Sequence, residues 1–145
     1  MKRIIHLGCI VILFLGFGLH GCEIESRENF HFTTLSATAA DLPEEFVLGE
    51  EYEIPVSLLL PDGCTSFEGF ESTIGIGNTR TVVAIGVVQT DQACTQAIRM
   101  EDHSFQISVT FTDTYHFRFY QGQSESGEAE YLEYSIPVVS ESSAP

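Results

Sequence analysis

The clearest pattern in this chain is SFQISVTFTDTYHFRF, at residues 104–119. In its first half, apolar residues at positions 105, 107, 109 and 111 alternate with serine, glutamine and threonine. This is the period of a half-buried strand. Residues 112–114, Thr-Asp-Thr, have turn composition, and the apolar alternation resumes at positions 115, 117 and 119. The stretch therefore predicts a β-hairpin that turns one face toward a core.

Further strands are expected before and after this stretch. In residues 51–60 the even positions are apolar, whereas Glu51, Glu53 and Ser57 share the other face. Residues 79–89 are apolar on both faces, which predicts a central strand covered on both sides. Apolar residues at 132, 134, 136 and 138 indicate a closing strand. About seven strands result, and the fold class expected is all-β, an immunoglobulin-like antiparallel β-sandwich.

Two local features refine this expectation. Asp113-Thr114-Tyr115 resembles the tyrosine corner of immunoglobulin-like domains, in which the phenol fixes a strand-to-strand crossing, although the usual Cys and Trp partners are missing. Pro55 lies on the outward set of its strand and predicts an edge strand or a bulge, because proline cannot donate to a ladder. Residues 91–100 break the alternation and are expected to form a loop or one short helical turn.

The N-terminus has a different character. Lys2 and Arg3 precede an apolar run, Ile4–Leu19, that stops at Leu19-His20-Gly21-Cys22. This segment resembles a bacterial lipoprotein signal, which implies cleavage before Cys22 and attachment of a diacylglycerol to its thiol. An ordinary secretory signal and an uncleaved anchor are the alternatives, and the run is short for a membrane span. The expected organisation is a signal peptide at 1–21, a polar tether at 22–29, a β-sandwich at 30–140 and a flexible tail at 141–145.

A second resemblance covers most of the mature chain. It rests on Gly63-Cys64-Thr65-Ser66-Phe67-Glu68-Gly69-Phe70, Arg80-Thr81-Val82, Cys94, and Tyr115-His116-Phe117-Arg118-Phe119. These blocks resemble a family of small lipoproteins from Bacteroidetes-type bacteria. The resemblance implies a lipid-anchored place in the cell envelope, at the outer membrane on its periplasmic or surface side. It implies no activity and no functional residue for this chain.

The mature chain is strongly acidic. It keeps four arginines and no lysine against all 21 acids, a net charge of −17. This charge disfavours nucleic acid and anionic lipid headgroups as partners, so membrane attachment would rest on the lipid. Solubility explains the acidity without a ligand. The alternative is calcium binding by the densest group of carboxylates, although its spacing fits no calcium-loop template. That group consists of Asp41, Glu44, Glu45, Glu50, Glu51 and Glu53.

Two cysteines remain once Cys9 is removed and Cys22 is lipidated. In an envelope compartment, Cys64 and Cys94 are most simply a disulfide. A redox pair is less well supported, because there is no C-x-x-C motif and no neighbouring lysine or histidine. A zinc site is disfavoured by the absence of paired histidines.

The sequence offers no catalytic constellation, and no enzyme or cofactor is predicted from it. The motifs G-x-S-x-G, H-E-x-x-H and the P-loop are absent, although a triad assembled only in the fold would escape this search. His116, Arg118 and Tyr120 lie on one side of a strand and are a candidate recognition face, with an ordinary solvated surface as the plainer alternative.

Three functional hypotheses follow from these observations. The leading one is a lipid-anchored, non-enzymatic interaction module whose partner is a protein or a glycan. Phe70, Tyr120 and Tyr131, beside Glu71 and Glu133, are the aromatic candidates for a glycan. The second is a calcium-dependent adhesion or scaffold domain. The third is an envelope hydrolase, which requires His103 or His116 to meet a serine or a carboxylate in a concave site.

Overall fold

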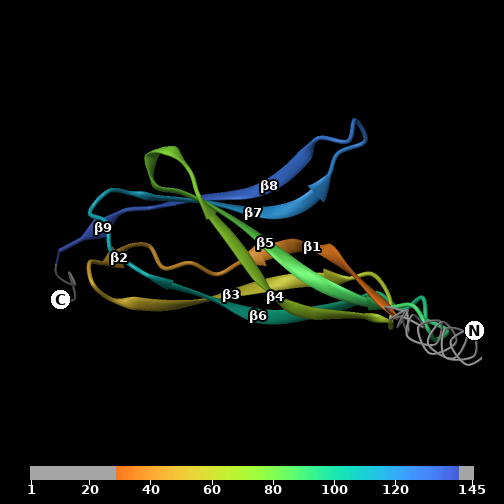
Figure 1. Cartoon of the computed structure of the whole chain (residues 1–145). Helices are drawn as coiled ribbons and strands as arrows, with labels where there is room; N and C mark the ends of the chain where they lie inside the picture. The colour runs from red at the N-terminus through yellow and green to blue at the C-terminus, as the bar shows by residue number, and fades with distance from the viewer. Residues whose placement is uncertain (1–28, 141–145) are drawn as a thin grey trace, which may run out of the picture.

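The computed structural model describes residues 29–140. The predicted signal peptide, Cys22 and the tail at 141–145 lie outside these residues. Among the described residues, seven strands of eight residues or more carry the fold (Figure 1). The elements are β1 (Phe30–Ala40), β2 (Phe46–Val47), β3 (Glu51–Leu60), β4 (Thr65–Ile74), the 3₁₀ turn η1 (Ile76–Asn78), β5 (Thr79–Gln89), β6 (Arg99–Ser108), β7 (Tyr115–Gln123), β8 (Ala129–Ile136) and β9 (Val138–Val139).

The strands form a β-sandwich whose two sheets share β1. The first half of β1 pairs with β5, and its second half pairs with β3. One sheet contains β4, β5, β7 and β8, and the other contains β3 and β6. The pairing of β1 with β3 contains a register shift between Ala37 and Ala39. The predicted all-β sandwich is confirmed.

Apolar side chains between the sheets form the core. In β3 the even positions from Ile54 to Leu60 are buried, as the alternation predicts. Tyr115, Phe117 and Phe119 fill the centre from β7, each at most 1% exposed. Phe46, in the two-residue strand β2, packs edge-on against Tyr115 at 5.7 Å between ring centroids. Within residues 29–140 there is no helix of the length and apolarity that a membrane span requires.

The predicted hairpin at residues 104–119 is wrong. The two strands lie in different sheets, since β6 pairs with β3 and β7 pairs with β8 and, in parallel, with β5. The connection crosses between the sheets, and the Tyr115 phenol oxygen accepts hydrogen bonds from the backbone N–H groups of Thr110 (3.0 Å) and Phe111 (3.2 Å). This is the geometry of a tyrosine corner, as predicted. The parallel β5–β7 pair also departs from the expected all-antiparallel arrangement.

Three other expectations met mixed outcomes. Strand β5 is central, between β4 on one side and β1 and β7 on the other. Its outward residues, such as Val83 and Ile85, are only half-buried, so it is covered on one face rather than two. Pro55 lies where the pairing of β1 with β3 has ended at Val56, so this part of β3 pairs with β6 alone and has an open edge, as predicted. The Pro55 carbonyl accepts a hydrogen bond from the backbone N–H of Asp41. Residues 90–98 form a loop.

Candidate functional site

A polar and aromatic surface lies on the outward side of β7 and β8. Because alternate β7 residues are buried in the core, His116, Arg118 and Tyr120 point away from it. The antiparallel register sets one β8 residue opposite each of the three. We call the resulting six residues the β7–β8 face: His116, Arg118, Tyr120, Tyr131, Glu133 and Ser135.

Arg118 is the centre of this face. Its Nε donates to Glu133 Oε1 at 3.0 Å, and its guanidinium carbon lies 4.0 Å from the centroid of the Tyr131 ring. Tyr131 in turn meets Tyr120 in an edge-to-face arrangement, with 6.1 Å between centroids. The Arg118 and Glu133 side chains are 41% and 66% exposed. Solvent screening limits such an ion pair to about 1 kcal/mol or less, so its main effect is to hold the guanidinium over the Tyr131 ring.

Beside this centre, His116 Nδ1 and Ser135 Oγ are hydrogen-bonded at 2.9 Å. The pair satisfies the distance that the hydrolase hypothesis requires, but it lies exposed on the open strand surface. A catalytic pair also needs a third group that orients the base. Within the described residues, the structure records no such group on the other His116 ring nitrogen.

The other histidines occupy different surroundings. His103, on β6, stacks on Phe67 with 3.9 Å between ring centroids, and its Nε2 lies 3.3 Å from Glu101 Oε2. Glu101 also bonds to Arg99, at 3.0 Å. His31 is exposed on β1. The fold therefore distributes the three histidines over three strands and does not bring them together.

The predicted acidic group is spread over two loops, before and after β2, and over the start of β3. Glu51 and Glu53 point outward from β3, where they accept hydrogen bonds from Ser108 Oγ and Gln106 Nε2, both at 3.2 Å. Asp41, Glu44 and Glu50 are exposed, and Glu45 is half-buried. In the part of the chain that the structure describes, no three of the Asp, Glu, His and Cys residues meet in a geometry that could hold a metal ion.

The aromatic candidates for a glycan are likewise divided. Tyr120 and Tyr131 belong to the β7–β8 face, but Phe70 does not join them. A register shift between Phe67 and Gly69 turns Phe70 inward, where its ring packs against Phe67 (4.9 Å) and Phe105 (5.8 Å between centroids). Gly69 interrupts the strand pattern in the sequence, but the pattern does not show which way the residues after it turn, so it does not separate Phe70 from the outward aromatics.

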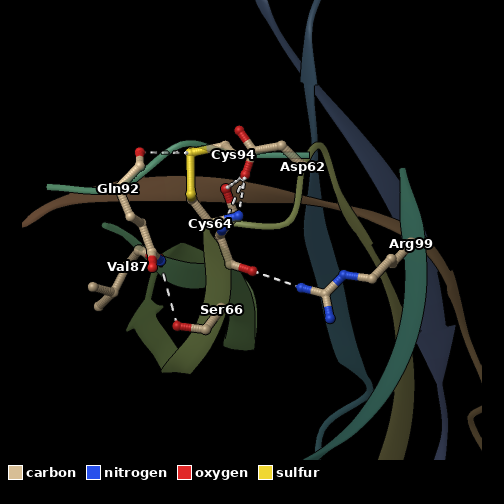
Figure 2. The surroundings of a disulfide bond; sticks show 8 residues. Asp62, Cys64, Ser66, Val87, Gln92, Cys94 and Arg99 are labelled. Atoms are coloured by element: carbon tan, nitrogen blue, oxygen red, sulfur yellow. Dashed lines mark hydrogen bonds between the residues drawn. A yellow bond between two sulfur atoms is a disulfide. The ribbon is translucent and has the colours of Figure 1, made fainter. Parts of the chain in front are cut away.

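The predicted disulfide between Cys64 and Cys94 is present, with 5.2 Å between the Cα atoms (Figure 2). It joins the start of β4 to the loop between β5 and β6. Arg99 reaches the same region from β6 and donates through Nη2 to the Thr65 carbonyl at 2.8 Å. The disulfide and this hydrogen bond tie three segments of the chain together at one end of the sandwich.

Asp62 organises the turn that precedes Cys64. Its Oδ1 accepts from the backbone N–H groups of Cys64 and Thr65, both at 2.9 Å, and from the Thr65 hydroxyl at 2.8 Å. The Thr65 hydroxyl contributes most to lowering the pKa of the Asp62 carboxyl below 3.8, burial opposes it, and the two N–H groups and the Arg99 charge lower it further. The carboxylate is therefore a structural acceptor.

Sequence reasoning missed Arg80, which is only 6% exposed. Its position shares the inward parity of Val82 and Ala84 on β5, and this parity was readable from the sequence. Its guanidinium carbon lies 5.4 Å from the Tyr115 ring centroid and 5.6 Å from that of Phe111. An always-charged side chain is rare at such a buried position.

Comparison with known proteins adds a family to this fold. A family model, the ORF11 beta-sandwich domain, matches residues 54–130, from the middle of β3 into the start of β8. Neither the curated proteins nor the solved structures contain a match to the chain. The matched segment is more than half of the sequence and includes most of the strands of the observed sandwich. The chain therefore belongs to the ORF11 beta-sandwich domain family.

Proposed function

We propose that the chain is a lipid-anchored cell-envelope lipoprotein, held by Cys22, whose β-sandwich is a non-enzymatic interaction module. The proposed location in the cell envelope rests on the N-terminal sequence. A charged start is followed by a short apolar run that stops at Leu19-His20-Gly21-Cys22. The Cys64–Cys94 disulfide supports this location, because disulfides persist in oxidising compartments.

The observation that carries the interaction role is the packing of Arg118 on Tyr131. Tyrosine and arginine are enriched among the residues that dominate binding energy at protein interfaces. In the β7–β8 face they are already held in place, by the Glu133 ion pair and by the Tyr120 ring, before any partner arrives. A prearranged side chain loses less conformational entropy on binding, which favours affinity.

The charge of the face defines the partner that would fit it. Arg118 is one of four arginines in the mature chain, and its guanidinium is accessible amid an acidic surface. A protein or glycan that offers a carboxylate to Arg118 and a flat apolar surface to the tyrosines matches these groups.

The test is capture of partners from envelope extracts of the source cells by the full chain in lipid vesicles. Arg118→Ala and Tyr131→Ala should each reduce recovery of the partner about tenfold, a loss of about 1.4 kcal/mol. Arg99→Ala is the matched control, because it removes an arginine that also pairs with a glutamate but lies outside the face. Equal recovery by all variants would overturn the proposal.

Two additions separate the alternatives in the same experiment. Deglycosylation of the extract distinguishes a glycan partner, which is then lost, from a protein partner, which remains. A chelator tests the calcium-dependent alternative, since calcium-linked adhesion is lost without the cation whereas binding through the β7–β8 face persists.

A further inference from the structure

The two sheets separate at the hairpin of β4 and β5, which rises away from β3 and β6 (Figure 1). A cavity of about 250 Å³ lies between the sheets at this opening. Its walls include Ser72 and Ile74 from the end of β4, Phe105 and Ile107 from β6, and Arg80 from β5. Ile74 and Ser72 have the inward parity of β4 but remain exposed, because no strand covers them.

Arg80 is the unusual member of this cavity. Only 6% of its surface is exposed. Among residues 29–140, no carboxylate forms an ion pair with it. Its Nε is buried without a hydrogen-bond partner. Guanidinium stays protonated at any pH a protein tolerates, so the charge cannot be removed by titration. The rings of Phe111 and Tyr115, and the Tyr115 phenol that interacts with the Arg80 side chain, offset this burial only in part, because none of them carries a full negative charge.

A buried cation without an anionic partner is costly, and replacing it with an apolar residue is often stabilising. Its presence beside an open cavity is therefore explained by a ligand that supplies the missing negative charge. Planar guanidinium pairs best with a carboxylate, through two parallel hydrogen bonds. Ile74, Phe105 and Ile107 add apolar surface beside the polar side chains of Ser72, Gln106 and Ser108. A short apolar group attached to the carboxylate would contact that apolar part of the wall.

We propose that this cavity binds the carboxylate of a small apolar acid, with Arg80 holding the carboxylate and Ile74, Phe105 and Ile107 enclosing the apolar part. The Ser72 hydroxyl is available as an additional donor. The same chemistry is offered by a free aliphatic acid and by the C-terminus of a peptide that ends in an apolar residue. This site is separate from the β7–β8 face and does not depend on the role proposed for it.

The test is calorimetric titration of the full chain, in a non-ionic detergent, with hexanoate. Hexanamide, of the same shape but neutral, should bind at least tenfold more weakly. Arg80→Met should reduce hexanoate affinity at least tenfold while leaving the unfolding midpoint of the ligand-free protein unchanged or raised. Titration with a tetrapeptide that ends in isoleucine, with a free or an amidated C-terminus, identifies the source of the carboxylate.

A pair of hairpin variants keeps the test independent of any change in the core. Ile74→Glu places a negative charge in the wall and should abolish hexanoate binding. Ile76→Glu makes the same change two residues away, at a side chain that is 98% exposed and outside the cavity, and should leave binding intact. The proposal is overturned if neither hexanoate nor the free-acid peptide binds, if hexanamide binds as well as hexanoate, or if both hairpin variants behave alike.

Discussion

Asp62 shows how one side chain can determine a turn. A single carboxylate oxygen accepts three hydrogen bonds from the two residues that lead into β4. Because these donors prefer the charged form, the pKa of Asp62 in the folded protein is below its ordinary 3.8. The carboxylate therefore stabilises the fold fully above pH 3.8, and this contribution is lost as the pH falls through the lower folded pKa.

We expect Asp62→Asn to remove this pH dependence. The difference in unfolding free energy between wild type and variant should be constant near neutral pH and should shrink as the pH drops below 3.8. Urea unfolding at a series of pH values measures it. Glu68→Gln, an exposed change on the adjoining strand, is the control. A difference that stays constant into strong acid would contradict the role given to the carboxylate.

Gly86 is a second position where a single side chain affects stability, because there is no room for a Cβ atom. It is buried on β5, and a Cβ added there would lie 2.9 Å from Leu35 Cδ2. Leu35 is itself 1% exposed and has little room to move. Gly86→Ala should destabilise the protein by about 1–3 kcal/mol through overpacking, measured by urea unfolding. Gly69→Ala, where an added Cβ meets nothing within 4 Å, should remain within about 0.5 kcal/mol of wild type.

At the level of elements, the crossing from β6 to β7 depends on one phenol. The Tyr115 oxygen accepts from two backbone N–H groups, and the ring is fully buried. Tyr115→Phe keeps the ring but leaves both donors without this acceptor, and should lower the unfolding free energy by about 1–3 kcal/mol. Tyr120→Phe, on the outward side of the same strand, is the matched control and should have little effect. Equal losses in the two variants would show that the crossing does not rely on the phenol.

The disulfide is the second connection between elements. It closes 30 residues of sequence, which corresponds to about 3–4 kcal/mol of stability in the chain-entropy model. Replacing both Cys64 and Cys94 with alanine should lower the unfolding free energy by about this amount. Reducing agent should produce a similar shift in the wild type and none in the double variant. A reductant effect that persists in the double variant would assign it to another part of the protein.

For the whole molecule, the balance of charge dominates. The net charge of −15 on the chain produces self-repulsion, which added salt screens. Sodium chloride should therefore raise the thermal midpoint. Calcium chloride at the same ionic strength should raise it by the same amount, because the described acids meet in no metal-binding group. An extra calcium shift that a chelator reverses would instead favour the calcium-dependent adhesion domain.

The buried faces were predictable for β3 and β7, but not for β4, where a register shift turns Phe70 inward, or for β5, which is covered on one face only. The alternation at 52–60 and 115–119 assigned the inward residues correctly, since the strand period of two is a local property of the backbone. The disulfide and the tyrosine corner were also predictable, because each rests on particular residue types. The β7–β8 face was only half predictable. Its β7 row follows from alternation, whereas Tyr131, Glu133 and Ser135 join it through a register between separate strands.

By itself, the sequence determined that the protein is a β-sandwich, which residues of β3 and β7 face its core, and which two cysteines join. Only the tertiary structure decided that β6 and β7 lie in different sheets, that β5 and β7 run parallel, and that Arg80 is enclosed beside an open cavity. The reason is physical. A side chain's face depends on its neighbours in the chain, but strand pairing and enclosure depend on contacts between distant segments, which no local pattern contains.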